Sequence, residues 1–382
     1  MKALKINKVE KIGILPTVDI EVNHPRHLYY ANGIATSNSH SVTYGKISYW
    51  TAWVKSHFPL HFYTAWLYYA VDKQFSEEEI EGLVEDCYGR DIDICPPTLS
   101  LINNENSAHF FLDREKVYFG LSDIKGLGVS EYNKLKNAVV RIEKDLGKGI
   151  EQWNWFEFLI HMSDNVSMTV INGLVMSGAA DYLGKSSRAR KLLEYSIWRD
   201  LSDKEKDYIR YSKVTSIEES IEIILGDSLI KVTEKRRAKL LHLLNSLKSS
   251  AYSTEDTITT IIKAEKQFLG LAVTCSNLDA CNTVSDTKCS DISSGKRGKV
   301  NLAVEIVSVR GHTIKKEGPS KGKKMAFLKL RDDSGFLECV VFSDKLSEFS
   351  SLLFKGNTVL LECVASDKNG SVSVIVNGAK QI

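Results

Sequence analysis

Asn38 and Ser39 are adjacent near the N-terminus, and His27 lies upstream of them. An asparagine side-chain amide can attack its own main-chain carbonyl, form a succinimide and break the bond to the next residue. A hydroxyl in that next position can first accept an acyl chain, so Asn38 would release a polypeptide and Ser39 would receive one. Because a hydroxyl is a weak nucleophile at its free pKa, an imidazole must move protons nearby, and His27 is the candidate.

The segments on the two sides of this pair differ in character. Val18–Val22 alternates like a strand and His27–Asn38 follows it, whereas Ser41–Tyr49 is aromatic with helical spacing. The upstream residues resemble the last two sequence blocks of an intein, which ends in Asn followed by Ser, Thr or Cys. Many inteins carry His before that Asn, whereas Ser37 stands there in this chain, as in some split inteins.

The intein resemblance implies that residues 1–38 are the small all-β C-terminal fragment of a split intein. It also implies that Asp19 assists the acyl-transfer steps, and that the chain acts in trans with a partner carrying the intein N-fragment. Taken alone, Asn32-Gly33 would be a type I′ hairpin turn between two strands. Both interpretations can hold, since intein folds contain such hairpins.

The composition sets the class of protein. A chain of 382 residues is too long for one ordinary domain, so we expect about two to four. The hydrophobic content of 43% is that of a globular chain, and the net charge of +2 leaves nucleic-acid binding to local patches. Seven scattered cysteines indicate reduced thiols of a cytoplasmic protein. Neither a secretory segment nor a long apolar run appears, so we expect no export and no membrane partner.

The run from Ser39 to Pro59 is long and specific, and reads S-H-S-V-T-Y-G-K-I-S-Y-W-T-A-W-V-K-S-H-F-P. It resembles part of the fingers domain of the bacterial DNA polymerase III alpha subunit, a C-family replicative polymerase. The pattern there is N-K-S-H-[SA]-x-x-Y-x-x-x-[SA]-Y-x-T-x-x-L-K-x-x-Y-P, and its Ser-His falls on the splice junction. The resemblance continues more thinly to the last residue. It implies a multidomain α+β protein in which residues 39–113 form part of a mainly helical fingers domain.

Two helices are expected in this region. Spacing predicts one at Val42–Ser56 and another at Pro59–Val71, with the proline as its first residue. The aromatic and apolar residues of the first helix are expected mostly in a core: Tyr49, Trp50, Trp53 and Val54. The resemblance makes three other residues candidates for contacting the incoming nucleotide or template phosphates, with ordinary solvated side chains as the alternative: His40, Lys46 and Lys55.

A pair of carboxylates follows the next predicted helix, which a capping box at Ser76–Glu79 opens and which runs to about Tyr88. Alternation would aim Asp91 and Asp93 at one face, as a two-metal polymerase site requires. The resembled family, however, places its metal-binding aspartates in a palm domain N-terminal to everything here. We therefore expect no metal site and no cofactor on this chain alone, with Mg²⁺ held by the partner in the assembled polymerase.

A helix-hairpin-helix region is expected within residues 114–195. Ala108–Leu112 and Lys116–Phe119 predict a β-hairpin, and Gly-Leu-Gly then falls between two helical stretches. Such glycines permit a tight turn and let backbone N–H groups approach phosphate oxygens. A plain interhelical turn is the alternative. Ile171–Asp181 resembles the companion segment, whose apolar residues would pack the motif together. The DNA-binding candidates are Lys125, Gly126 and Gly128.

Residues 196–298 are expected to form a helical, charged connecting region with a basic cluster at Lys235–Arg237. Gln267–Leu271 superficially resembles the motif with which bacterial relatives bind a sliding clamp, but it aligns better with another family segment. A clamp partner is therefore left open. The cysteines of this region lack close-pair zinc spacing and are interpreted as ordinary thiols: Cys275, Cys281 and Cys289.

Residues 299–382 have the pattern of an OB-fold β-barrel. Strands are expected at 300–309, 325–331, 336–342, 359–365 and 372–376, with a helix at 344–354. The run 324–335 resembles the OB module of the polymerase family, and OB folds bind single strands with basic loops and exposed rings. A solvated loop is the alternative. The binding candidates at 310–324 are Arg310, Lys315, Lys316, Lys321, Lys323 and Lys324.

These observations predict the C-terminal half of a DNA polymerase III alpha-type replicative DNA-directed DNA polymerase. It would become active only after trans-splicing to an N-terminal half that carries the palm, and would then bind template-primer DNA and single-stranded DNA. The end of the sequence after the OB-fold suggests a streamlined replicase, from a bacterium or a phage, working in the bacterial cytoplasm. The alternative is a stand-alone DNA-binding or accessory replication protein that is never spliced.

Overall fold

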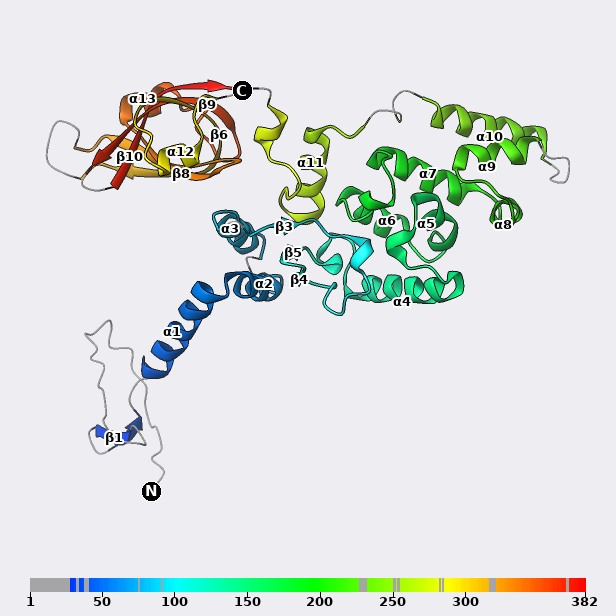
Figure 1. Cartoon of the computed structure of the whole chain (residues 1–382), viewed down its shortest axis with the longest axis horizontal. Helices are drawn as coiled ribbons and strands as arrows, with labels where there is room; N and C mark the ends of the chain where they lie inside the picture. The colour runs from blue at the N-terminus through cyan, green and yellow to red at the C-terminus, as the bar shows by residue number, and fades with distance from the viewer. Residues whose placement is uncertain are drawn as a thin grey trace, which may run out of the picture. The chain divides into compact units, whose positions relative to one another are not determined.

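The computed structural model describes most of the chain beyond residue 27 (Figure 1). The described residues are 28–31, 34–37, 41–74, 76–90, 92–226, 232–249, 252, 255–281, 283, 285–315, 321–368 and 371–382. The chain divides into two units, Met1–Phe62 and Tyr63–Ile382. Among the described helices, none is both long enough and apolar enough to span a bilayer.

The N-terminal unit contains a pair of strands and a long helix. β1 (Leu28–Ala31) and β2 (Ile34–Ser37) are antiparallel, with Ala31 opposite Ile34, so the expected strand pair is present. α1 (Ser41–His57) follows, and α2 (Pro59–Ala70) begins at the proline predicted to start it. The residues predicted to carry out or adjoin splicing, Asp19, His27, Asn38, Ser39 and His40, lie outside the described residues.

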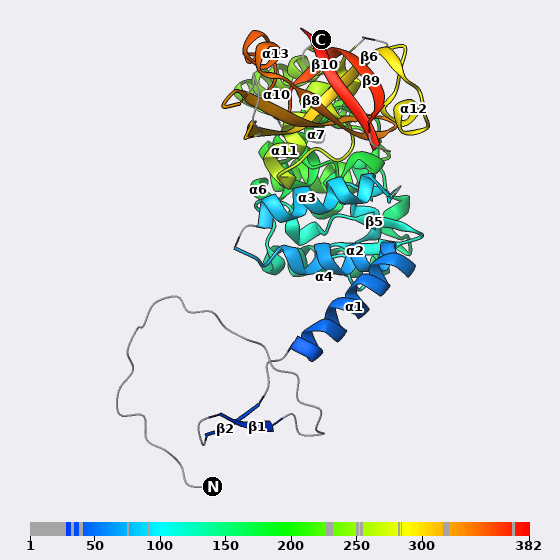
Figure 2. The same cartoon turned by 90° about the vertical axis from the view of Figure 1, so that its left-hand side faces the viewer.

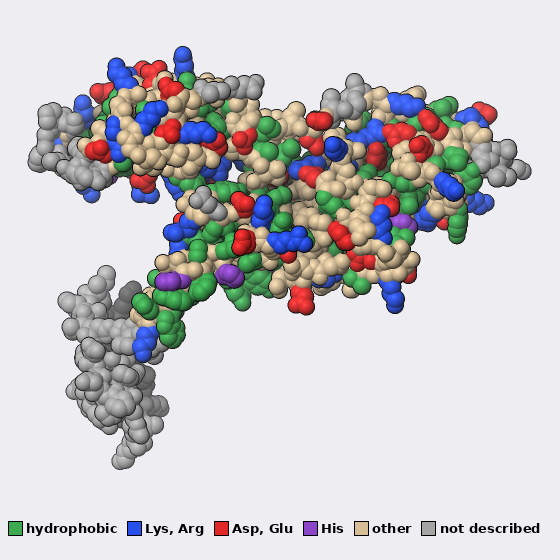
Figure 3. Space-filling model, in the orientation of Figure 1, with side chains coloured by type: hydrophobic (Ala, Val, Ile, Leu, Met, Phe, Trp, Pro, Cys, Tyr) green, Lys and Arg blue, Asp and Glu red, His purple; other side chains and the backbone are tan. Residues whose placement is uncertain are grey.

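The aromatic face of α1 does not lie in a core, contrary to expectation. Tyr49 and Trp50 are 66% and 63% exposed, and Trp53 is 43% exposed. Val54 is half-buried. Figure 3 shows hydrophobic side chains along this helix. Helical spacing predicts which residues share a face, but whether that face is buried depends on the element that packs against it. In this chain the rings of α1 are left to solvent.

The second unit begins within α2, whose Tyr63, Leu67 and Ala70 are buried. α3 (Ser76–Tyr88) has the bounds that its capping residues predict. A three-stranded sheet follows in the order β3 (Ile94–Cys95), β5 (Lys116–Tyr118), β4 (Phe111–Asp113). β4 and β5 form the predicted hairpin, with the turn residues Arg114 and Glu115 at φ of 45° and 66°; β4 begins later and β5 ends earlier than expected.

Helices dominate the next part of the chain, as predicted for residues beyond 196. They are α4 (Val129–Leu146), α5 (Trp155–Met162), α6 (Met168–Met176), α7 (Arg188–Asp200), α8 (Asp203–Tyr211), α9 (Ile217–Gly226), α10 (Glu234–Leu247) and α11 (Ile258–Leu269). This part of the chain and the segments beside it also contain short 3-10 turns: η1 (Leu99–Leu101), η2 (Leu121–Asp123), η3 (Ile150–Gln152), η4 (Asp181–Leu183) and η6 (Asn277–Ala280). Arg236 of the basic cluster pairs with Asp200 and Glu205, so this residue holds helices together.

A buried ion pair fixes α11 against α7. Arg188 lies 3.4 Å from Glu265 and 2.8 Å from Asp181, and both Arg188 and Glu265 are buried. Glu265 also accepts the backbone N–H groups of Val273 and Thr274 at 2.8 and 2.9 Å. Removing one partner of such a buried pair costs about 3–5 kcal/mol, because the other charge is left without compensation. α11 is therefore a fixed support for the segments that contact it.

Five strands close into a barrel at the C-terminus, in the order β10-β8-β7-β6-β9 (Figure 1, Figure 2). They are β6 (Gly298–Thr313), β7 (Lys324–Asp332), β8 (Gly335–Val341), β9 (Thr358–Lys368) and β10 (Ser371–Gln381). All five predicted strands are confirmed. The helix predicted at 344–354 is shorter, at α13 (Ser343–Glu348). The short α12 (Cys289–Ser293) was not predicted, and its Cys289 and Ile292 join the barrel core.

Candidate nucleic-acid interface

β7 has one face in the barrel core and one outside it. Ala326, Leu328 and Leu330 are buried in the core, as strand alternation requires. The residues between them point outward, and Phe327 is 39% exposed. A phenylalanine in the outward series of a strand is a departure from the inside-outside pattern, and it provides a ring on which a base could stack.

A β-bulge in β6 decides which residues accompany that ring. Ile306 pairs with Leu330 and Ser308 pairs with Lys329, so Val307 is an extra residue on β6. Such a bulge reverses the alternation beyond it. As a result Arg310 pairs with Phe327 and lies on the same outer face of the sheet. Without the bulge Arg310 would point into the barrel, because it is an odd number of positions from Glu305, whose side chain points outward.

Arg310, His312 and Phe327 together form what we call the open face of the barrel. The rings of His312 and Phe327 meet edge to face, with centroids 6.1 Å apart. Arg310 is exposed, and within the described part of the chain it makes no ion pair. A ring flanked by an arginine offers stacking to a base and charge to a phosphate, which is the combination found where proteins bind single strands.

The basic β6–β7 loop borders the open face. Its base is closed by two backbone hydrogen bonds, from Ile314 N–H to Lys323 O at 3.0 Å and from Gly322 N–H to Ile314 O at 2.9 Å. The four lysines that the structure describes here are exposed, whereas Lys316 lies outside the described residues. The structure thus brings together five predicted residues on this loop and the adjoining strand ends: Arg310, Lys315, Lys321, Lys323 and Lys324.

Further along the same strands the barrel surface is covered by α3. We call Lys329, Arg331 and Phe336 the covered face. Lys329 Nζ lies 3.3 Å from a carboxylate oxygen of Glu85 and 4.6 Å from the centroid of the Phe336 ring. The guanidinium of Arg331 lies 5.6 Å from the centroid of the Tyr88 ring. Burial raises the pKa of Tyr88 to about 12, so its hydroxyl stays protonated at neutral pH.

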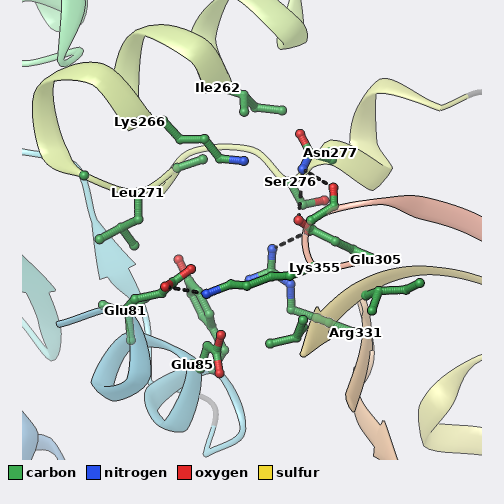
Figure 4. A pocket seen from close by; sticks show the side chains of 17 residues that line it. Glu81, Glu85, Ile262, Lys266, Leu271, Ser276, Asn277, Glu305, Arg331 and Lys355 are labelled. Carbon is green, nitrogen blue, oxygen red and sulfur yellow. Dashed lines mark hydrogen bonds and ion pairs between the residues drawn. The ribbon is translucent and has the colours of Figure 1, made fainter. Parts of the chain in front are cut away.

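A cavity of about 370 Å³ lies where α3, α11 and the barrel meet (Figure 4). Lys355, in the turn before β9, reaches across it and lies 2.7 Å from Glu81 of α3. On the barrel side Arg331 donates to Glu305 at 2.9 Å. The lining carries charges of both signs, so the cavity selects neither an anion nor a cation. It shows instead that α3 and the barrel meet through polar contacts around a gap.

The Gly-Leu-Gly segment forms a tight exposed turn before α4. Gly126 has φ of +91°, a conformation that favours glycine, and Leu127 is fully buried beneath the turn. The backbone N–H of Lys125 donates to Phe268 O of α11 at 2.9 Å, which fixes the turn to that helix. Gly128 is the N-cap of α4 and provides no side-chain cap, so the first-turn N–H groups of this long helix face outward.

The helix expected before this turn is only the single 3-10 turn η2, so that part of the helix-hairpin-helix expectation is wrong. The companion segment packs as expected. Val170, Ile171, Leu174 and Val175 of α6 are buried, and Gly173 leaves room for Ile124 and the Lys125 carbonyl against its backbone. Gln267–Leu271, which superficially resembled a clamp motif, forms the end of α11, with Gly270 as its C-cap.

An acidic side chain lies beneath the same turn. Asp123 is hydrogen-bonded to His109 at 2.7 Å, and its other carboxylate oxygen is buried without a partner among the described residues. Burial raises the pKa of Asp123 to about 6, because the ionised form loses its hydration. His109 lowers the pKa of this carboxyl by a smaller amount. The charge state of Asp123 therefore changes between mildly acidic and neutral pH.

The two predicted lysines of α1 do not converge. Lys46 and Lys55 are nine positions apart, which places them about half a turn from each other around the helix axis. Lys55 is half-buried, with its ammonium 5.8 Å from the centroid of the Phe62 ring, whereas Lys46 is exposed. One phosphate cannot contact both residues on the same side of the helix.

Of the carboxylate pair considered for metal binding, the structure describes Asp93 alone. Asp91 lies outside the described residues, and Asp93 is exposed and lies 3.5 Å from Lys116. Over the described ranges, no three His, Cys, Asp or Glu side chains are grouped so as to hold a metal ion.

Sequence reasoning missed two residues of the open face, His312 and Phe327. A usable signal existed for Phe327, because it falls in the outward series of β7 with Lys329 and Arg331. His312 carried no such signal, since its face is set by the bulge at Val307.

The barrel order and its outer face define the class of this part of the protein. A family model described as an OB-fold nucleic acid binding domain matches residues 300–382. The fold is therefore a mixed helical and sheet structure that ends in an OB-type five-stranded barrel, as predicted. The mitochondrial single-stranded DNA-binding protein of S. cerevisiae is 15% identical, with a TM-score of 0.19, covering 23% of this chain and 96% of that chain.

Over most of its length the chain is similar to the C-terminal part of DNA polymerase III alpha subunits. It is 26% identical to the DNA polymerase III subunit alpha of Deinococcus radiodurans, over 89% of this chain and 23% of that protein. It is 25% identical to the subunit of Escherichia coli K12, over 86% of this chain and 26% of that protein. The chain therefore spans about a quarter of the length of these curated relatives.

Proposed function

We propose that residues 39–382 are the C-terminal part of a C-family replicative DNA polymerase and contact template-primer DNA and single-stranded DNA. The observation that carries the proposal is the similarity to DNA polymerase III alpha subunits over 86–89% of this chain, against 23–26% of theirs. Contacts to DNA would come from three places: the fingers part, the Gly126–Gly128 turn and the open face of the barrel. A sliding clamp is a further candidate partner, and the bacterial cytoplasm is the proposed site of action.

The exposed rings of α1 support the view that another polypeptide covers this helix. A monomer rarely leaves several large rings uncovered on neighbouring turns, and such patches mark protein interfaces. α1 carries Tyr49, Trp50 and Trp53 in this state. In proteins most of the stability of a helix also comes from the tertiary packing of its apolar face. The larger part of the polymerase, present in the relatives but not in this chain, is the proposed cover.

Trans-splicing is the proposed route by which the two parts become one chain. Residues 1–38 would act as the C-terminal fragment of a split intein, with Asn38 cyclising and Ser39 accepting the N-terminal polymerase half. His27 would move protons and Asp19 would assist the acyl transfer. The second candidate function, a stand-alone DNA-binding accessory protein, is favoured by the OB-type barrel, which can bind single strands without the rest of a polymerase.

Mixing the purified chain with a polymerase N-terminal half that ends in an intein N-fragment separates the two candidates. Splicing produces a new species heavier than residues 39–382 alone, together with a released fragment of residues 1–38, both measured by mass spectrometry. Asn38→Ala and Ser39→Ala should each abolish the ligated product. A chain that keeps its first 38 residues in the mature replicase would support the stand-alone alternative.

We assign nucleotidyl transfer with two Mg²⁺ ions to the partner, because the resembled polymerase family carries its metal-binding aspartates in a palm domain N-terminal to the residues present here. The chain alone should therefore extend no primer at any magnesium concentration, while the ligated protein should do so. Incorporation by the chain alone, measured on a labelled primer-template, would contradict this assignment. Asp91 and Asp93 would then be the candidates for holding the metal ions.

A further inference from the structure

The outer surface of β7 and β8 repeats the chemistry of the open face in the half that α3 covers. Phe336 pairs with Arg331 across the strands, and the Lys329 ammonium lies 4.6 Å from the centroid of the Phe336 ring. Arg331 is four residues along β7 from Phe327, which is roughly 13 Å. The barrel thus presents two successive sites of the same kind, each with a ring next to cations. Only the first is uncovered.

α3 meets the covered face with groups that resemble those of a nucleic-acid strand. Glu81 and Glu85 are one helical turn apart and pair with Lys355 at 2.7 Å and Lys329 at 3.3 Å. Three residues further on, Tyr88 stacks its ring against Arg331. Two negative charges followed by an aromatic face correspond to two phosphates followed by a base. α3 therefore gives the cationic side chains of the barrel contact partners of the same kind as those of a bound strand.

We propose that the covered face is an extension of the single-strand binding site, and that α3 occupies it until a sufficiently long strand displaces the helix. Lys329 and Phe336 would provide most of the new contacts, because Arg331 keeps its partner Glu305 within the barrel. This inference rests on the proposed binding of single strands by the open face. A strand seated on Arg310 and Phe327 would enter the covered face along the same two strands.

The contacts that hold α3 in place are of a kind that a strand can replace. Lys355 and Glu81 are about half exposed, and solvent-exposed ion pairs contribute little and weaken with salt. The 370 Å³ cavity beside them shows that this part of the boundary is not close-packed. Incoming phosphates would supply the charges that Glu81 and Glu85 supply now, so no lysine would be left unpaired during the exchange.

The test compares short and long strands on the full-length chain. Fluorescein-labelled oligothymidylates of about 4 and about 16 nucleotides bracket the site sizes of OB folds. In the double variant Glu81→Gln/Glu85→Gln, the affinity for the long strand should rise about three- to tenfold, while the affinity for the short strand should stay unchanged. The matched control, Glu77→Gln/Glu78→Gln, removes the same charge from an exposed part of α3 that makes no contact with the covered face.

Amide hydrogen exchange gives a direct second measurement. The long strand should accelerate exchange in residues 76–88, and the short strand should not. Equal affinity gains in both double variants would show a general charge effect and overturn the inference. So would an unchanged long-strand affinity in Glu81→Gln/Glu85→Gln. If the parent binds neither strand, the proposed binding of single strands by the open face fails. Binding of the long strand that is gained only in Glu81→Gln/Glu85→Gln would still support the proposal that α3 covers a binding site.

Discussion

The rings of His312 and Phe327 meet edge to face on the outer surface of the barrel, with centroids 6.1 Å apart, although fourteen residues separate them along the chain. They stand beside Arg310 and the basic β6–β7 loop. This small platform is the part of the molecule where stacking and phosphate contact can occur together.

Replacing Phe327 with alanine should weaken binding of a short oligothymidylate by about 1–3 kcal/mol, or roughly 5- to 150-fold, because one stacking ring is lost. The side chain is partly exposed, so the free energy of unfolding should change little. Fluorescence anisotropy gives the affinity. Tyr211→Ala is a matched control, since Tyr211 is 91% exposed on α8 and lies away from the barrel strands. An equal loss in both variants would remove Phe327 from the binding site.

Neutralising the cations beside the open face should flatten the salt dependence of single-strand binding. Each phosphate contact contributes about −0.7 to the slope of log K against log salt. Substituting Arg310, Lys323 and Lys324 by glutamine should therefore reduce the slope by up to about 2. The same measurement on Lys235→Gln/Lys263→Gln provides a control for the loss of positive charge elsewhere. Identical slopes for the parent and the triple variant would exclude this loop from the path of the strand.

The two glycines before α4 should respond differently to alanine. Gly126→Ala places a Cβ at φ of +91° and 3.3 Å from a methyl group of Thr169, so it should lower the free energy of unfolding by about 1–2 kcal/mol. Gly128→Ala has an ordinary φ of −67° and open space, so it should cost less than about 1 kcal/mol.

If the α4 N-terminus binds phosphate, Gly128→Ala should nevertheless weaken binding to duplex DNA, because the new methyl group obstructs the approach to the backbone N–H groups. Urea unfolding measures the change in the free energy of unfolding, and fluorescence anisotropy with a labelled duplex measures the change in affinity for DNA. A Gly128→Ala chain that is folded and binds duplex DNA as well as the parent would contradict phosphate binding at this turn.

The buried Asp123 should make the chain less stable as pH rises from about 4 to about 6. Its pKa is raised from 3.8 to about 6 in the folded protein, so in that interval the folded state binds more protons than the unfolded state. The loss should be roughly 2–3 kcal/mol, complete above the folded pKa. Urea unfolding of the parent and Asp123→Asn across this range measures it.

Asp123→Asn should gain stability relative to the parent as pH rises, because the amide does not ionise. A difference between the two proteins that stays constant from pH 4 to pH 7 would show that His109 fully compensates the ionised carboxylate. Asp93→Asn is the matched control, since it replaces a carboxylate by an amide at an exposed position.

Local signals in the sequence predicted where several helices and strands lie. The capping box Ser76–Glu79 predicted the start of α3, and Pro59 predicted the start of α2, because both signals act within one helical turn. The OB-fold pattern of residues 299–382 predicted the five barrel strands, and the structure confirms them. The polymerase resemblance was likewise visible in the residues after Ser39.

Only the tertiary structure decided which face of each helix or strand is buried and which is exposed. The rings of α1 share a helical face in the sequence, yet Trp50 and Tyr49 are exposed, because burial depends on a packed neighbour and not on spacing. The extra residue Val307 turned Arg310 and His312 toward Phe327, and α3 came to lie over Lys329 from more than two hundred residues away. Chain-local patterns carry periodicity, whereas strand register and the docking of distant elements arise from contacts between residues that no local pattern links.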